Sequence, residues 1–172
     1  MKKTLLFSLL IGLVSCSSAE KHPDYDANLA LVKAAFEAHE NENIEDWLAC
    51  FSVNLVHESA LYGVGRIGLD AQRKQMERYH QEFDSIKFTK AIWLQGVKFK
   101  TNVPDGSVRC YGTWTGIHTS TGKEIAMSAY HYFDFKNGRI DESGDFFDFG
   151  GMMNAVLAGT GQNHPLEAIE NE

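Results

Sequence analysis

The sequence predicts an α+β domain in which helices come first and a long antiparallel sheet follows. Residues 25–83 hold apolar side chains at helical spacing in three segments, around one short strand. Residues 85–149 instead alternate in the manner of strands and are separated by turn signals. Helices and antiparallel strands that are segregated along the chain are typical of the α+β class, and the helices cover one face of the sheet. If the sheet curls strongly, a pocket forms between the sheet and the helices.

Helical spacing of apolar residues predicts three helices before the sheet. In the first, Leu29, Val32 and Phe36 recur every three or four residues and form one apolar stripe. The second carries Trp47 and the third Met76 on an equivalent stripe. We expect the helices at residues 25–40, 44–51 and 70–83, with a short strand at 52–58 and a glycine-bearing loop at 59–68.

Turn signals divide the rest of the chain into strands. Asn137-Gly138 joins two apolar-rich runs, and a type I′ hairpin turn favours this dipeptide because both of its central residues need a positive φ. We expect strands at residues 85–100 and 107–119, two further strands within 123–149, and a last short helix at 150–158. The predicted domain therefore spans residues 25–158, and the polar, acidic residues 159–172 are expected to form a flexible tail.

The first residues have the pattern of an export signal. Lys2 and Lys3 precede an apolar stretch at residues 4–14 that is too short to span a bilayer. The stretch ends in Leu13-Val14-Ser15-Cys16, which resembles the lipobox of bacterial lipoproteins. That resemblance implies a lipid on Cys16, a place on the bacterial cell envelope at the periplasmic face of the outer membrane, a signal peptide at residues 1–15 and a tether at 16–24. An ordinary secretory signal with an incidental cysteine is the alternative.

The charge of the chain argues against nucleic acid as a partner. The 172 residues carry a net charge of −7. Removal of residues 1–15, which hold two lysines and no acidic residue, leaves −9. Phosphate binding requires clustered Lys and Arg, and the sequence contains no basic run. We therefore expect no nucleic-acid partner.

The sequence does not decide whether the two cysteines other than Cys16 form a disulfide. Cys50 closes a helical apolar run, and Cys110 lies in a predicted strand. In a compartment that permits disulfides they either form one bridge or remain as two buried thiols, because spacing alone does not show whether they meet.

One histidine and one carboxylate fall on strands that are otherwise strongly apolar. The period of two puts Met127, His131 and Phe133 on one face of the strand before the Asn-Gly turn, and Asp145 lies among phenylalanines after it. Burying either group without a partner costs on the order of a few kcal/mol. We therefore expect His131 and Asp145 to pair in an enclosed pocket, either as an acid/base site or as a structural pair that stabilises the core.

The order of elements over residues 26–156 resembles the cone-shaped fold of nuclear transport factor 2 and its relatives, which include ketosteroid isomerase, scytalone dehydratase and the SnoaL-like polyketide cyclases. Two places carry the resemblance: Val56-His57-Glu58 before the glycine-bearing loop, and His131 followed by Asn137-Gly138-Arg139-Ile140 and Asp145. The resemblance implies a curved antiparallel sheet with about three N-terminal helices, and a pocket in which the His and the Asp act in acid/base chemistry. Glu58 matches the position at which ketosteroid isomerase carries its base.

The candidate site combines polar and apolar side chains. The catalytic candidates are His131, Asp145 and, at the rim of the pocket, Glu58. Candidate walls for a flat, apolar ligand are Tyr62, Trp93, Trp114, Met127 and Phe133. The histidines and carboxylates show no metal-binding spacing, and neither a P-loop nor a dinucleotide motif is present, so we expect no metal and no cofactor.

Three functions remain open from the sequence. The first is a cofactor-free acid/base enzyme, of isomerase, cyclase, dehydratase or hydrolase type, that acts on a small apolar carbonyl compound. The second is an envelope protein that binds such a molecule without turnover. The third is an assembly module that forms a homodimer through the outer face of the sheet. Polar and aromatic side chains suited to an interface alternate on that face, at Tyr111, Thr113, Ser128, Tyr130 and Tyr132.

Overall fold

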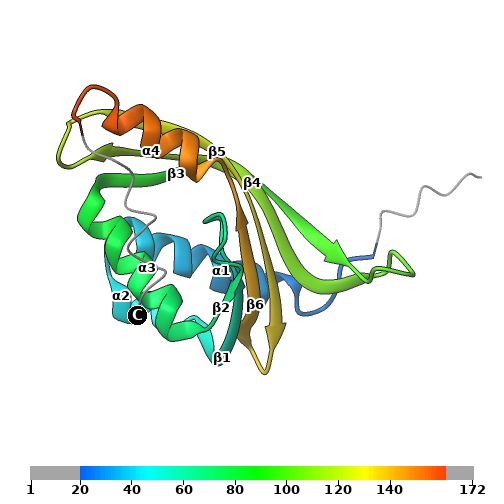
Figure 1. Ribbon diagram of the computed structural model, residues 1–172. Coiled ribbons are helices and arrows are strands. Elements are labelled where there is room, and N and C mark those ends of the chain that lie inside the picture. The colour runs from blue at the N-terminus through cyan, green and yellow to red at the C-terminus, as the bar shows by residue number, and fades with distance from the viewer. Residues whose placement is uncertain (1–19, 162–172) are drawn as a thin grey trace, which may run out of the picture.

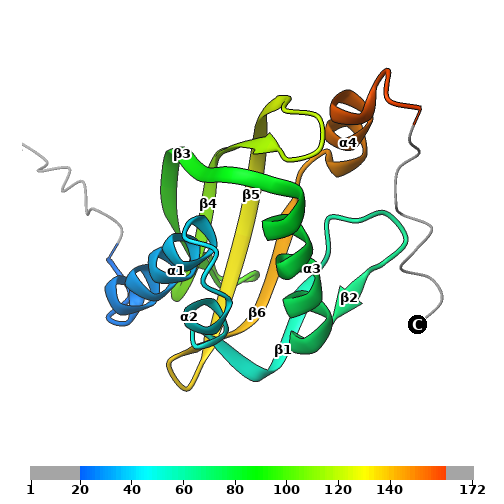
Figure 2. The ribbon, with the colours of Figure 1, turned by 90° about the vertical axis from the view of Figure 1, so that its left-hand side faces the viewer.

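A curved sheet of six strands wraps around the helices. The computed structural model describes residues 20–161. In chain order the elements are α1 (Tyr25–Glu40), α2 (Ile44–Leu48), β1 (Phe51–Glu58), β2 (Arg66–Ile67), α3 (Leu69–Glu82), β3 (Phe83–Val97), β4 (Pro104–His118), β5 (Glu124–Lys136), β6 (Arg139–Phe146) and α4 (Phe149–Leu157). Helices α1 and α3 lie on the concave side of the sheet, and α4 lies at one end (Figures 1 and 2). The predicted α+β fold with a curved sheet is confirmed.

The strand order differs in one respect from a simple antiparallel meander. The strands follow the order β2-β1-β6-β5-β4-β3. Strand β1 pairs in parallel with β6, so the sheet is mixed, and the expectation of a wholly antiparallel sheet is corrected. This parallel pairing places the early strand β1 between β2 at the edge of the sheet and β6, the last strand of the chain.

The bend of the sheet arises from irregularities in β3. Its pairing with β4 shifts register between Asp84 and Lys87 and again between Thr89 and Ile92. Two non-glycine residues within these shifts, Ser85 and Lys90, have positive φ angles of 56° and 54°. Such bulges bend a strand and increase its twist. The concave face that results is deep enough to hold helices as well as a cavity.

The Asn-Gly hairpin forms as predicted, and a bulge beside it sets the register of the last two strands at the site. Asn137 and Gly138 have φ angles of 52° and 71°, which a type I′ turn requires. His131 on β5 and Asp145 on β6 are direct partners across the pair. The register of the turn alone would set His131 opposite Gly144. A one-residue shift between Asp134 and Phe135 instead brings His131 opposite Asp145, so this bulge makes the contact on which the site depends.

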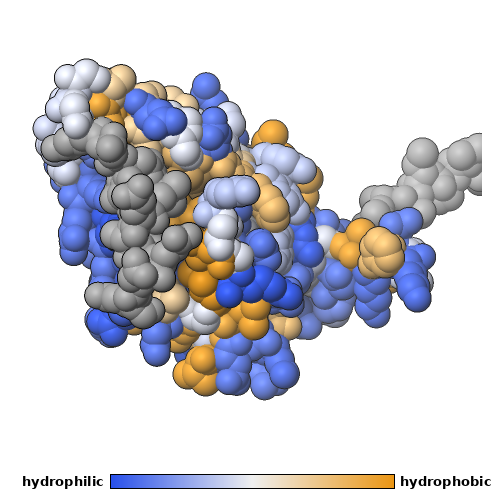
Figure 3. All heavy atoms as spheres, in the orientation of Figure 1, coloured by the Kyte–Doolittle hydropathy of each residue, from blue (hydrophilic) through white to orange (hydrophobic). Residues whose placement is uncertain are grey.

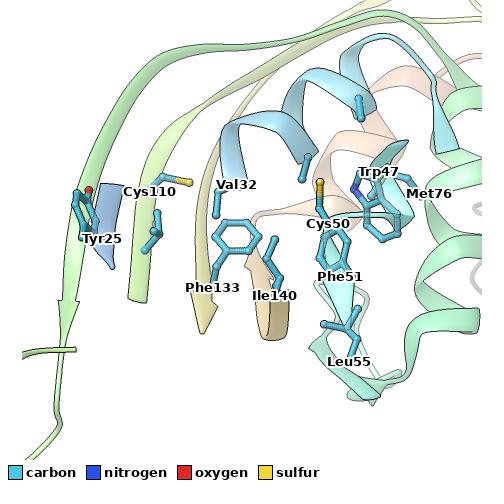
Figure 4. Close-up of a cluster of buried hydrophobic side chains, with 13 residues drawn as sticks. Tyr25, Val32, Trp47, Cys50, Phe51, Leu55, Met76, Cys110, Phe133 and Ile140 are labelled. Atoms are coloured by element: carbon cyan, nitrogen blue, oxygen red, sulfur yellow. The ribbon is translucent and has the colours of Figure 1, made fainter. Parts of the chain in front are cut away.

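The core lies between α1, α2, α3 and the sheet. In one buried cluster Val32 of α1 packs with Phe133 of β5 and Ile140 of β6 (Figure 4). Cys50 and Cys110 belong to the same cluster as two free, buried thiols, and burial raises the pKa of Cys110 to about 12. A thiol of that pKa stays protonated and behaves as a small apolar side chain.

Local capping explains where the short helices begin. Asn43 accepts a hydrogen bond from the backbone N–H of Asp46 at the start of α2, and Asp148 accepts one from Gly151 at the start of α4. Asp148 is thus a helix cap, as its place before Phe149-Gly-Gly indicates.

Within residues 20–161, none of the helices combines the length and the apolar character needed to cross a membrane. The predicted signal peptide, Cys16 and most of the predicted acidic tail (residues 162–172) lie outside the described residues.

Candidate active site

A cavity lies between the concave face of the sheet and helices α1 and α3. Its volume is about 90 Å³, whereas one water molecule needs roughly 10–15 Å³. Most of its wall is apolar and aromatic, with Phe36, Trp114, Met127 and Phe133 among the lining residues. Polar side chains also line it, among them His39, His57, Gln72, His131, Ser143 and Asp145. An apolar chamber with a few converging polar groups is the usual form of a small-molecule site.

His131 is held by hydrogen bonds at both ring nitrogens. The indole Nε1–H of Trp114 donates to His131 Nε2 at 2.9 Å, and His131 Nδ1 lies 2.7 Å from Asp145 Oδ1. An indole N–H only donates, so Nε2 must be the unprotonated nitrogen. The proton of the neutral ring therefore sits on Nδ1 and is donated to Asp145.

His57 reaches the same carboxylate from the other neighbouring strand. In the parallel β1–β6 pair His57 stands opposite Ser143, and His57 Nδ1 lies 2.9 Å from Ser143 Oγ. His57 Nε2 lies 3.5 Å from Asp145 Oδ2 and has no hydrogen-bond partner among the described residues. The ring is 2% exposed, so Nε2 is left unsatisfied in an enclosed place. Catalytic hydrogen bonds are often long before a ligand binds.

The two histidines control the ionisation of Asp145. Burial by itself raises the pKa of this carboxyl, but the interactions with His57 and His131, including the hydrogen bond from His131, outweigh burial and lower it. Burial has the opposite effect on His57, whose pKa it lowers. These shifts favour a carboxylate on Asp145 beside a neutral imidazole on His57.

A second set of polar side chains comes from α1 and α3. His39 Nδ1 lies 2.8 Å from His80 Nε2, and the His39 ring meets Trp114 edge-on with centroids 5.0 Å apart. Burial and the neighbouring His80 lower the pKa of His39 to about 3. On α3 the side-chain oxygen of Gln72 is buried without a hydrogen-bond partner among the described residues.

The structure brings five of the predicted site residues to the cavity. His131, Asp145, Trp114, Met127 and Phe133 all line it. They do so because β4, β5 and β6 present the residues of one pleat face toward α1.

Three other predicted site residues lie elsewhere, and their placement is corrected. Strand β1 is regular at its end, so His57 points inward, and Glu58 points outward toward Arg66, with 3.8 Å between Arg66 Nε and Glu58 Oε2. Tyr62 lies on the loop between β1 and β2 and is 96% exposed. Trp93 packs beside Phe36 and under the ammonium group of Lys33, outside the cavity lining.

Sequence reasoning missed His57, Gln72, Ser143 and His39 as site residues. The period of two shows that either His57 or Glu58 faces inward, but it does not say which. His39 continues the apolar stripe of the first helix, and this was its available signal. Gln72 gives no signal, because a glutamine on a polar helix is ordinarily exposed.

The part of the chain that the structure describes contains no cluster of three or more His, Cys, Asp and Glu side chains suited to a metal ion.

Several known proteins resemble this chain in sequence or in fold. The model of a family described as a SnoaL-like domain matches residues 32–143. A candidate isomerase from Bacillus subtilis is 16% identical, with a TM-score of 0.67, and the match covers 80% of this chain and 97% of that one. A candidate polyketide cyclase from Xanthomonas campestris pv. campestris is 16% identical, with a TM-score of 0.64, over 77% and 98% of the two chains.

A third structure, an LEH-like epoxide hydrolase from M. tuberculosis, is 22% identical, with a TM-score of 0.57, over 80% of this chain and 95% of its own. At these identities the likeness shows a shared fold. The search of curated proteins finds no match.

We expect the domain to lose stability as the pH falls from about 6.5 toward 3, in part through His39. A histidine in the unfolded chain binds a proton below about pH 6.5, whereas folded His39 binds one only near pH 3. In this window the unfolded state holds more protons, so acid favours it. The variant His39→Gln keeps a polar partner for His80 but does not titrate. Its unfolding free energy should fall less steeply with decreasing pH, by at most about 1.4 kcal/mol per pH unit. Urea unfolding between pH 7.5 and 4.5 measures both slopes, and equal slopes would contradict the expectation.

Proposed function

The chain belongs to the SnoaL-like domain family, and we propose that it is a cofactor-free acid/base enzyme for a small apolar molecule with a carbonyl or hydroxyl group. One observation carries the proposal: the buried Nε2 of His57, without a hydrogen-bond partner among the described residues, lies 3.5 Å from Asp145 Oδ2 in an apolar cavity. A buried polar atom without a partner is costly, and a ligand that supplies the partner removes this cost.

The geometry suggests how the roles are divided. Asp145 Oδ1 accepts the hydrogen bond from His131, so the other oxygen, Oδ2, is the one free to take a proton. His57 Nε2 stands beside that oxygen and can stabilise or exchange the transferred proton. His131 then acts as a positioning residue, because Trp114 and Asp145 occupy both of its nitrogens.

The apolar walls would hold the body of the ligand. Trp114, Phe133 and Met127 contact the same cavity as the carboxylate. The unpartnered oxygen of Gln72 adds an acceptor for a ligand hydroxyl or N–H. The names of the solved neighbours, an isomerase, a cyclase and an epoxide hydrolase, support a small organic substrate.

A non-catalytic binding protein is the second candidate. It is favoured by the bonds at both nitrogens of His131, since a fully bonded His–Asp pair also suits a structural role. The two candidates differ in whether a proton leaves the ligand.

We expect the protein to catalyse exchange of the α-hydrogens of cyclohexanone in D₂O, a probe of proton abstraction from a small apolar ketone. Replacing Asp145 by Asn removes the proton acceptor and should slow the exchange by about a hundredfold or more. The control Trp93→Phe changes an aromatic residue outside the cavity and should leave the rate unchanged. Proton NMR measures the exchange. Binding of cyclohexanone without exchange in the unmodified protein would favour the binding-protein alternative.

We also propose that a lipid on Cys16 anchors the protein to the bacterial cell envelope, at the periplasmic face of the outer membrane. The support is the apolar stretch that runs into Leu13-Val14-Ser15-Cys16. A bacterial host should process the unmodified chain to a form that begins with lipid-modified Cys16 and partitions into membranes. The variant Cys16→Ser should lose the lipid, as mass spectrometry of the N-terminal peptide will show. Equal membrane partitioning of a correctly exported Cys16→Ser protein would refute the anchor.

The outer face of the sheet supports a homodimer. Tyr130 lies between Tyr111 and Phe146, with ring centroids 4.8 Å and 5.8 Å away, and Tyr111 and Phe146 are each about half exposed. Exposed aromatic rows of this kind are typical of interfaces.

We expect the Cys16→Ser protein to sediment as a dimer at tens of micromolar (roughly the range in which weak interfaces still associate). Tyr111→Lys should shift it to a monomer, because two like charges would face each other across a symmetric interface. Tyr62→Lys is the matched control, since Tyr62 is exposed on the loop between β1 and β2 and takes no part in the ring contacts of this row. A protein that is monomeric without any substitution would rule out the dimer.

A further inference from the structure

The hairpin of β3 and β4 ends in an exposed apolar tip. Beyond the last strand pair, Val97 with Pro104, the backbone N–H of Lys98 donates to the carbonyl of Val103 and closes the loop at residues 98–103. Phe99 is 94% exposed, Val103 52% and Val97 43%. A phenylalanine on an ordered turn, fully open to water, packs against nothing in the described chain. Figures 1 and 3 show this end projecting from the body of the domain, with apolar surface upon it.

The charge of the tip differs from that of the rest of the protein. Lys98 and Lys100 flank Phe99, are exposed, and form no ion pair with a described residue. The chain as a whole carries −7. A locally basic, apolar point on an acidic protein is complementary to an anionic lipid surface, and lysines there can extend their charge to the headgroups.

The N-terminal part of the described chain runs along the same hairpin. The backbone N–H of His22 donates to Gln95 Oε1 at 3.1 Å, and Asn28 donates to the carbonyl of Gly106 at 2.9 Å. These contacts hold the start of the domain against the base of the tip. Six residue steps separate Cys16 from His22, a reach of at most about 20 Å. A lipid on Cys16 would therefore keep this end of the domain near the bilayer.

From these observations we propose that the tip formed by Val97, Phe99 and Val103, with Lys98 and Lys100, docks into the interface of an anionic bilayer. The proposal rests on the lipid anchor proposed above. A single lipid chain gives only weak attachment, so a second contact made of apolar side chains and lysines adds to it. It also fixes which side of the domain faces the membrane.

An environment-sensitive fluorophore on Phe99→Cys tests the proposal in the full chain. The label is selective, because Cys50 and Cys110 are buried and the lipid occupies Cys16. In vesicles of phosphatidylethanolamine with phosphatidylglycerol, we expect the emission at position 99 to rise several-fold and shift to the blue. The matched label on Tyr62→Cys, equally exposed, should keep its aqueous spectrum. Glutamate at both Lys98 and Lys100 should reduce the change at position 99.

The outcomes separate the tip from the anchor. An aqueous spectrum at position 99 in vesicle-bound protein, or equal changes at positions 62 and 99, would overturn the proposal. The mass of the N-terminal peptide is measured first. If Cys16 carries no lipid, the anchor fails, and the labelled protein with Cys16→Ser is added to the same vesicles. A blue shift at position 99 then upholds the tip as a membrane-binding element by itself, and an unchanged spectrum overturns it.

Discussion

The burial of one carboxylate constrains much of this structure. Asp145 lies in a predominantly apolar chamber, where an ionised group without partners would cost several kcal/mol. Its partners come from both neighbouring strands, His131 from β5 and His57 from β1. Asp145 on β6 has a partner on each side only because β1 pairs with β6 in parallel. The topology of the sheet therefore determines which groups stabilise the ionised carboxylate.

The aromatic wall around this carboxylate limits the contact of the carboxylate with bulk water. Phe36 of α1 stands at its centre, with ring centroids 4.8 Å from Phe88 and 5.1 Å from Trp114. It also meets His131 edge-on at 5.4 Å. A low local dielectric strengthens each hydrogen bond to Asp145, and it raises the cost of each group left unpaired. The unsatisfied atoms of His57 and Gln72 stand out against that background, and this is why they indicate a ligand.

The sequence predicted the parts of this arrangement that depend on local periodicity. Alternation along β5 gave the inward face of His131, and Asn137-Gly138 gave the hairpin that pairs β5 with β6. The sequence did not give the bulge between Asp134 and Phe135 that sets His131 opposite Asp145. The sequence could not give the position of β1, because the parallel pairing with β6 joins residues that are more than eighty positions apart. Without that pairing, the choice between His57 and Glu58 had no basis. Tyr62 and Trp93 were misplaced for a similar reason: aromatic character indicates burial or an interface, but not which cavity a side chain lines.

The role of Trp114 shows how a single donor can decide the chemistry of a buried pair. Considered alone, His131 and Asp145 could share a proton in either direction. The indole N–H adds a fixed donor at Nε2, and this holds the ring in its Nδ1–H form. To become an imidazolium, His131 would have to give up that hydrogen bond although its ring is buried. The proton between His131 and Asp145 therefore stays on His131 Nδ1, and the proposed proton transfer falls to Asp145 Oδ2 and His57 Nε2. Trp114, which the sequence analysis assigned to the ligand wall, therefore also sets which atoms of the site are available for the proposed proton transfer.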